Sequence, residues 1–379
     1  MKKKITYLSL EGITSTVFSS QVYELLNSKI TEKNEVTLVL LQPLNARLNK
    51  SNLKKLINLK KNTKFKVSII PYIAFKNKFS LLNAFIFMII FKMNYCFEKN
   101  ERIFHCRGQE ATYLAIKLKK VFTNIKILSD IRGIPSDELK GINDRRSKYF
   151  ENIDKKIFVD NKQNVSWFNF VSEVLKQYYS YSDINCSVIP CFSKLKGSRN
   201  KECKDSINVI YVGGQQYYQN IDKIPKVLDK LKKPNIRLTL CLNGNKNSVL
   251  EEKIRRSNYN CEFKYNLSQD ELDEIYSRSN IGIIIRENKL LNMVASPVKI
   301  SEYLSKGLYL IMVGKIGDFY NDISNDIRLG VTFSDIDNIT DFSIDEVYIN
   351  NEFNTRISYS NRFSKEKCVD DYKKVYELL

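Results

Sequence analysis

The segment SPVKISEYLSKGLYLI (296–311) carries three polar side chains at a regular spacing. Ser296, Lys299 and Glu302 are each three residues apart, so in a helix they would share one face. The proline and the amphipathic residues after it predict that a helix begins here, and free backbone N–H groups point outward at a helix start. A hydroxyl, an ammonium and a carboxylate beside such N–H groups suit an anion that also carries hydroxyls.

The residues just upstream extend this pattern. The apolar run IGIII (281–285) predicts a strand with Arg286 and Glu287 at its end. Arg and Lys together suit a diphosphate, because a guanidinium is a planar fork and an ammonium is a point charge. A glutamate at the start of a buried helix suits the diol of a ribose. The alternative is a helix with a solvated, charged face.

Polar residues also follow two predicted strands in the first half of the chain. His105, the only histidine, comes just after one strand, and Asp130 and Arg132 follow the next. His105 could donate a hydrogen bond to a substrate or carry a proton near neutral pH, or it could be a structural histidine. Asp130 could orient an acceptor hydroxyl and Arg132 could bind phosphate, or the two could simply form an internal ion pair.

Two glycine segments complete the candidates. Gly12 lies between a predicted strand and hydroxyl residues that open a helix, where backbone N–H groups could bind a phosphate or a sugar hydroxyl. The G-x-G-x-x-G spacing is absent, and a plain capped helix is the alternative. Gly213 and Gly214 end another predicted strand and would let a ligand approach the backbone closely.

The elements that position these residues alternate between strands and helices. The predicted strands are 5–10, 36–41, 67–71, 103–106, 125–129, 157–159, 207–212, 237–242, 261–265, 281–285 and 308–313. The predicted helices are 16–28, 80–92, 109–122, 167–178, 221–231, 269–277 and 299–305. Such alternation predicts parallel sheets with helices on both faces, and ligands of open parallel sheets bind beyond the carboxyl ends of the strands.

Two such series predict an α/β protein with two doubly wound, Rossmann-like parallel-sheet domains that face each other across a cleft. We expect an N-terminal domain at 1–190, a polar linker at 191–206 and a C-terminal domain at 207–360. The stretch 361–379 has an amphipathic pattern and predicts a helix that packs back toward the N-terminal domain.

Composition narrows the class of protein further. The chain has 379 residues, of which 43% are hydrophobic, and eight cysteines with no C-x-x-C spacing. This pattern indicates neither a zinc site nor a disulfide framework. No secretory signal is apparent near the start, and a reducing cytoplasm is therefore expected.

Positive charge is concentrated near the N-terminus. The net charge is +19, of which +12 lies in residues 1–92, and 47–66 holds eight basic residues and no acid. The apolar run LLNAFIFMIIF (81–91) is flanked by lysines but is too short to span a bilayer. It is either a buried core helix or a segment that enters the headgroup region of an anionic membrane, and a nucleic-acid-binding face is a third reading.

Taken together, these motifs resemble those of a known family. The late segment, preceded by IIIREN, resembles the nucleotide-binding segment of bacterial GT-B glycosyltransferases, in particular the large retaining family that builds lipopolysaccharide, capsule and other surface glycans. The resemblance extends to STVFSSQVYELL, HCRGQEATYLA, SDIRG, SVIPCF and IYVGG in the expected order. Val294 stands where the family has the first of two glutamates, GGQQYYQN replaces the usual G-R…K, and Tyr309 replaces a proline.

The resemblance implies that the domain at 1–190 binds the acceptor and that the domain at 207–360 binds the nucleotide sugar. It also implies roles for individual residues. Glu302 would hold the nucleotide ribose, Lys299 and Ser296 would lie by the diphosphate with Arg286 close by, and His105 would lie near the transferred sugar.

The implied reaction is glycosyl transfer to a hydroxyl of a glycan acceptor, with retention of configuration and without a metal or other cofactor. The N-terminal charge suits a lipid-linked acceptor and a peripheral position on the inner face of the cell membrane, bound through residues 47–92. Two alternatives remain: a sugar-nucleotide epimerase on the same fold, and a non-catalytic protein that binds membranes or nucleic acid through basic patches.

Overall fold

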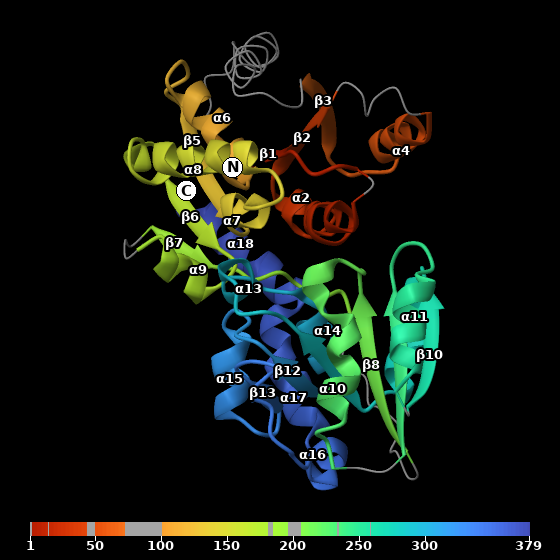
Figure 1. Ribbon diagram of the computed structural model, residues 1–379. Helices are drawn as coiled ribbons and strands as arrows, with labels where there is room; N and C mark the ends of the chain where they lie inside the picture. The colour runs from red at the N-terminus through yellow and green to blue at the C-terminus, as the bar shows by residue number, and fades with distance from the viewer. Residues whose placement is uncertain are drawn as a thin grey trace. The chain divides into compact units, whose positions relative to one another are not determined.

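The computed structural model describes residues 2–13, 15–43, 50–72, 101–180, 185–195, 206–232, 235–257 and 259–379. The chain divides into two compact units (Figure 1). Unit 1 comprises Met1–Pro190 and Cys368–Leu379, and unit 2 comprises Cys191–Lys367. In each unit every strand pairing of the described sheet is parallel. The predicted fold class of two doubly wound parallel-sheet α/β domains is confirmed.

Unit 1 contains a seven-stranded sheet in the order β3-β2-β1-β4-β5-β6-β7. Its strands are β1 (Lys4–Ser9), β2 (Glu35–Pro43), β3 (Lys66–Tyr72), β4 (Arg102–Arg107), β5 (Ile125–Ile131), β6 (Trp167–Phe170) and β7 (Cys186–Val188). Its helices are α1 (Glu24–Leu26), α2 (Ile30–Lys33), α4 (Lys50–Lys61), α6 (Gln109–Lys119), α7 (Pro135–Leu139), α8 (Asp144–Phe158) and α9 (Glu173–Tyr178). A π-helical segment, Phe18–Tyr23, precedes α1, and most of α18 (Lys365–Leu378) belongs to this unit.

Unit 2 contains a six-stranded sheet in the order β10-β9-β8-β11-β12-β13. Its strands are β8 (Ile207–Gly213), β9 (Ile236–Leu242), β10 (Asn260–Tyr265), β11 (Ile281–Ile285), β12 (Tyr309–Val313) and β13 (Gly330–Phe333). Its helices are α10 (Ile224–Leu228), α11 (Ser248–Arg255), α12 (Gln269–Arg278), α13 (Leu290–Met293), α14 (Val298–Ser305), α15 (Phe319–Asn325), α16 (Glu346–Asn351) and α17 (Phe353–Ser360).

Strand β11 is apolar throughout because both of its faces are buried. Ile281, Ile283 and Ile285 pack into the core on one face of the sheet, whereas Ile284 packs into the core on the other face. Because successive side chains of a strand point to opposite faces, a strand that helices cover on both sides has no solvated face. The run IGIII therefore predicts a central strand of a doubly covered sheet, which is where β11 lies.

Two predicted elements were wrong. Residues 157–159, predicted as a strand, include the last turn of α8, which extends to Phe158. Residues 167–178, predicted as one helix, form strand β6 followed by α9. In both places a short apolar run fits a strand and a buried helix face equally well, and pairing with β5 and β7 decides the outcome for β6.

Two other predictions concern residues that are only partly described. The apolar run 81–91 and its predicted helix lie outside the described residues, as does most of the predicted linker, 196–205. Of the helices that the structure describes, none has the length and hydropathy that a membrane span requires.

A buried arginine fixes the end of α14 to the last helices of unit 2. Arg356 has no exposed surface, and its guanidinium donates to the backbone carbonyls of Gly307 (2.7 Å), Arg328 (2.8 Å), Tyr348 (2.6 Å) and Ile349 (2.7 Å). One side chain thus satisfies four carbonyl groups from three places in the chain.

We expect Arg356→Met to destabilise unit 2 by about 3 kcal/mol or more, because it leaves several buried carbonyls without donors. Urea unfolding measures this loss. The control is Arg362→Met, since Arg362 forms a half-exposed ion pair with Asp322 at 3.0 Å and such pairs contribute about 1 kcal/mol or less. Equal effects of the two substitutions would contradict the role assigned to Arg356.

Candidate functional site

The strand order of unit 2 reverses at one position. Strands β8 and β11 are neighbours, and the chain proceeds from β8 outward through β9 and β10 but from β11 outward through β12 and β13. In such sheets ligands bind at this reversal, beyond the carboxyl ends of the strands. Gly213 ends β8, and Arg286 directly follows β11.

Helix α14 is held over this position by Tyr303. The fully buried ring of Tyr303 packs against Gly282 of β11, where any side chain would collide with it. The hydroxyl of Tyr303 accepts a hydrogen bond from the backbone N–H of Val212 in β8 (2.8 Å). One tyrosine therefore ties α14 to both central strands and places the first turn of the helix beside the end of β8.

Lys299, in that first turn, lies against the backbone of Gly213. A side chain at position 213 would collide with the Lys299 ammonium. The ammonium donates to Oε1 of Gln219 (3.1 Å) and to the hydroxyl of Tyr211 (3.4 Å), and it lies 4.6 Å from the centre of the Tyr211 ring. Glycine at 213 thus leaves the space that this cation occupies.

Arg286 is a second cation of this site. Its Nη1 donates to the backbone carbonyl of Tyr218 (3.3 Å), and its Cζ lies 5.0 Å from the centre of the Tyr218 ring. Burial lowers the pKa of Arg286, and burial together with the charge of Arg286 lowers the pKa of Lys299 well below its ordinary value. Within the described part of the chain, neither cation has a carboxylate oxygen within 4.0 Å. Two desolvated charges that repel each other favour the binding of an anion.

Glu302 lies one turn beyond Lys299 on α14. Its Oε2 accepts a hydrogen bond from the hydroxyl of Tyr276 (3.1 Å). Burial raises the pKa of Glu302 to about 7, although this hydrogen bond and the charge of Lys299 act in the opposite direction. The carboxyl group is therefore half-ionised near neutral pH.

The remaining predicted residues of unit 2 have other partners. Ser296 is 9% exposed, and its hydroxyl accepts a hydrogen bond from the backbone N–H of Cys191 (3.3 Å). Glu287 forms an ion pair with Lys289 at 2.7 Å. The carbonyl oxygen of Gly214 lies 3.2 Å from the hydroxyl of Tyr211. The structure thus brings Gly213, Arg286 and Lys299 together around one point.

Sequence reasoning missed two side chains that hold Lys299. Tyr211 is 1% exposed and Gln219 is 7% exposed. Tyr211 lies in an apolar strand, so its sequence context predicts a core residue. Gln219 lies in the segment GGQQYYQN, which has no recognisable pattern. The sequence signal was the replacement of expected cations by glutamines in that segment.

In unit 1 the predicted residues form a buried network. His105 lies within β4 and Asp130 within β5, not after these strands as predicted, because strand pairing continues to Arg107 and Ile131. His105 has no exposed surface. Its Nδ1 lies 2.6 Å from the hydroxyl of Tyr376, and its Nε2 lies 3.4 Å from Oδ2 of Asp130. Burial lowers the pKa of His105 despite the neighbouring carboxylate, so the imidazole is neutral near pH 7.

Asp130 is the centre of this network. Its Oδ1 accepts hydrogen bonds from Asn169 (2.6 Å) and from Nη1 of Arg132 (3.2 Å), and Arg107 lies 3.7 Å from its Oδ2. Arg132 also donates to the hydroxyl of Tyr372 in α18 (3.4 Å). The predicted Asp130–Arg132 pair therefore exists and is internal to unit 1.

Gly12, in contrast, reaches the surface. It follows β1, it is exposed, and a side chain built there would meet no atom within 4 Å. Strands β1 and β4 are the neighbours at which the strand order of unit 1 reverses. Near this point Glu11 lies 3.6 Å from Arg107, so a ligand at Gly12 would meet one carboxylate and one arginine.

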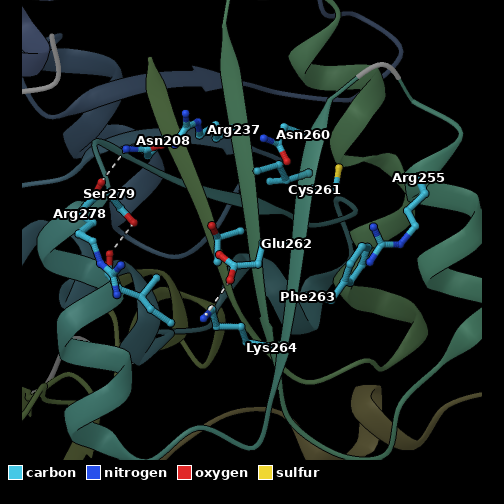
Figure 2. Close-up of a pocket in the computed structure, with 13 residues that line it drawn as sticks. Asn208, Arg237, Arg255, Asn260, Cys261, Glu262, Phe263, Lys264, Arg278 and Ser279 are labelled. Carbon is cyan, nitrogen blue, oxygen red and sulfur yellow. Dashed lines mark hydrogen bonds and ion pairs between the residues drawn. The ribbon is translucent and has the colours of Figure 1, made fainter. Parts of the chain in front are cut away.

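A cavity of about 510 Å³ lies elsewhere in unit 2, near the amino-terminal ends of the strands (Figure 2). Its lining includes Asn208, Arg237, Asn260, Lys264 and Arg278. Lys264 pairs with Glu262 at 2.9 Å, and Arg278 pairs with Glu274 at 2.8 Å. None of the residues around Lys299 lines this cavity, so it is separate from the site at the carboxyl ends.

Comparisons with known proteins give fold similarity only. No protein-family model and no curated protein sequence matches the chain. Among solved structures, Anabaena HepE in complex with UDP-glucose is 9% identical, with a TM-score of 0.67, over 99% of this chain and 100% of that one. A glycosyltransferase from Rickettsia africae is 15% identical, with a TM-score of 0.66, over 99% and 98%. An α,α-trehalose 6-phosphate synthase from Burkholderia multivorans is 8% identical, with a TM-score of 0.65, over 99% and 98%.

These similarities extend over nearly the whole of both chains. Together with the two parallel sheets, they show that this chain has the GT-B fold of glycosyltransferases.

We expect Glu302→Gln to stabilise the ligand-free protein increasingly as the pH rises from 5 to 8. The carboxyl binds its proton more tightly in the folded state, since its pKa is about 7 instead of 4.5. The free energy of unfolding of the wild type therefore falls by about 1–3 kcal/mol as the pH rises from 5 to 8. That of the variant does not, because glutamine has no proton to lose. Thermal unfolding of both proteins across this range measures the difference. A difference that does not change with pH would contradict the raised pKa.

Proposed function

We propose that this protein is a glycosyltransferase that transfers a sugar from a nucleotide-sugar donor to a hydroxyl of a glycan acceptor. The observation that carries the proposal is the pair of cations at the strand reversal of unit 2. Arg286 and Lys299 lie there without a carboxylate partner in the described structure. A diphosphate would neutralise both charges.

In this proposal the donor binds through its nucleoside diphosphate. Arg286 and Lys299 bind the diphosphate oxygens, and Gly213 lets the lysine lie against the backbone. Glu302, when ionised, accepts hydrogen bonds from the ribose diol. Because carboxylate oxygens are acceptors and both ribose hydroxyls are donors, the ionised form is the one that binds.

The reaction breaks the bond between the sugar carbon and the diphosphate oxygen, and the bonding electrons leave with the diphosphate. A new bond forms between that carbon and the acceptor oxygen on the same face, which retains configuration. The acceptor proton passes to an oxygen of the departing diphosphate. Arg286 and Lys299 stabilise the negative charge that develops there, and the proposal includes neither a metal nor another cofactor.

Unit 1 is the proposed acceptor-binding unit. Since His105 and Asp130 are fully buried, the proposal gives them no direct contact with the sugar, and Gly12 is the predicted residue that a ligand can reach. Helix α4 carries exposed lysines above a buried face formed by Leu56 and Leu59. This charge supports a lipid-linked acceptor at an anionic membrane surface, as in the synthesis of bacterial surface polysaccharides.

The first test is a thermal-shift screen against UDP, GDP, CMP and dTDP. One nucleotide should raise the melting temperature of the wild type, because a ligand that binds only the folded state stabilises it. Lys299→Ala, Arg286→Gln and Glu302→Ala should lose most of this shift and remain folded.

Arg237→Gln is the matched control, because Arg237 is an exposed arginine of unit 2 that lines the separate cavity of Figure 2. This variant should keep the full shift. Full nucleotide affinity in the Lys299 and Glu302 variants would reject the site, and the absence of a shift with every nucleotide would count against a transferase.

A second test concerns the membrane. Replacing Lys54, Lys55, Lys60 and Lys61 by Gln should weaken binding to vesicles that contain anionic lipid, by about 1 kcal/mol for each lysine near the surface. Co-sedimentation measures the loss, with neutral vesicles as the control. Unchanged binding would remove α4 from the proposal.

A further inference from the structure

We infer that Gln219 is a positioning residue, which holds the ammonium of Lys299 at the end of β8 without neutralising it. This inference rests on the proposed function, because it concerns the cation that would bind the donor diphosphate. Gln219 ends a short 3-10 turn, Tyr217–Gln219, in the segment that follows β8, and its side chain is buried.

The side-chain carbonyl of Gln219 is an acceptor for Lys299. Its Oε1 accepts hydrogen bonds from Lys299 Nζ (3.1 Å) and from the hydroxyl of Tyr211 (2.9 Å). Its Nε2 donates to Oε1 of Gln216 (3.4 Å), which fixes the orientation of the amide. The side-chain carbonyl is therefore aimed at the lysine.

Tyr211 completes the hold on the ammonium. Its hydroxyl accepts a hydrogen bond from Lys299 (3.4 Å), and its ring faces the charge at 4.6 Å. An ammonium has three N–H donors, and these contacts use two of them. The third donor remains for a ligand.

The amide is chemically suited to this task. A carboxylate at position 219 would form an ion pair with Lys299 and cancel the charge that a diphosphate needs. An apolar side chain at position 219 would leave the desolvated ammonium with the Tyr211 hydroxyl as its one acceptor. Lys299 would then lose its proton or rotate away from β8. A neutral acceptor avoids both outcomes.

Two substitutions separate these effects. Gln219→Met and Gln219→Glu should each raise the dissociation constant for the bound nucleotide about tenfold, measured by calorimetry with UDP, GDP and dTDP on the full chain. The groups that face Lys299 are Tyr211 of β8, Arg286 after β11 and Glu302 of its own helix, and all remain in both variants.

The pH dependence distinguishes positioning from general damage. Affinity should fall at alkaline pH as Lys299 loses its proton. In Gln219→Met this fall should begin at lower pH than in the wild type, because the cation has lost an acceptor. In Gln219→Glu it should begin at higher pH, because a carboxylate favours the charged form. Misfolding would not shift the two profiles in opposite directions.

Gln215→Met is the matched control in the same segment. The amide of Gln215 donates to the carbonyls of Asn243 (3.1 Å) and Asn245 (2.8 Å) rather than contacting Lys299, so affinity and pH profile should be unchanged. If the Met variant does not fold, Tyr211→Phe provides the test, with a smaller loss of affinity.

The outcomes separate this inference from the proposed function. A wild type that binds a nucleoside diphosphate, with variants at 219 that match it in affinity and in pH profile, would overturn the role of Gln219 alone. A wild type that binds none of the three nucleotides would overturn both.

Discussion

The hydrogen bond from the backbone of Val212 to the hydroxyl of Tyr303 is the interaction on which the candidate site depends. It forms only because Gly282 leaves space for the ring between α14 and the sheet. With α14 fixed in this way, its first turn lies beside the end of β8, and Lys299 approaches Gly213. A shift of the helix by one residue would rotate Lys299 by about 100° around the helix axis, since there are 3.6 residues per turn, and would separate it from Gln219 and Tyr211.

The buried cations of unit 2 differ in their hydrogen-bond partners. Arg356 donates to four backbone carbonyls from all three of its guanidinium nitrogens, so it contributes to the fold. Lys299 and Arg286 are held by fewer neutral acceptors and by aromatic faces, and burial lowers the pKa of both, as it also lowers the pKa of Arg356. Leaving cations desolvated and without counter-ions costs stability. A ligand that supplies negative charge would offset this cost, and this is the basis of the proposed donor site.

Unit 1 contains a polar network of the opposite kind. Asp130 is surrounded by Arg132, Arg107 and Asn169, and its pKa lies far below the ordinary value because these cations and hydrogen bonds outweigh burial. Tyr372 and Tyr376 of α18 add their hydroxyls to the same network. The chain end is thereby fixed in unit 1 by hydrogen bonds inside its core. His105 and Asp130 lie within strands β4 and β5, and their contacts are internal to unit 1.

The sequence by itself determined the fold class and the main cations of the site. Alternating apolar runs specify parallel strands and covering helices, because burial on both faces leaves no polar position in strands such as β11. The spacing of Lys299 and Glu302 places them on one helix face, since that geometry is local. Only the tertiary structure decided whether 167–170 pairs as a strand, whether His105 is exposed, and which side chains hold Lys299. Each of these depends on contacts between residues far apart in the chain, such as Gln219 with Lys299 and His105 with Tyr376, and local sequence patterns carry no information about such contacts.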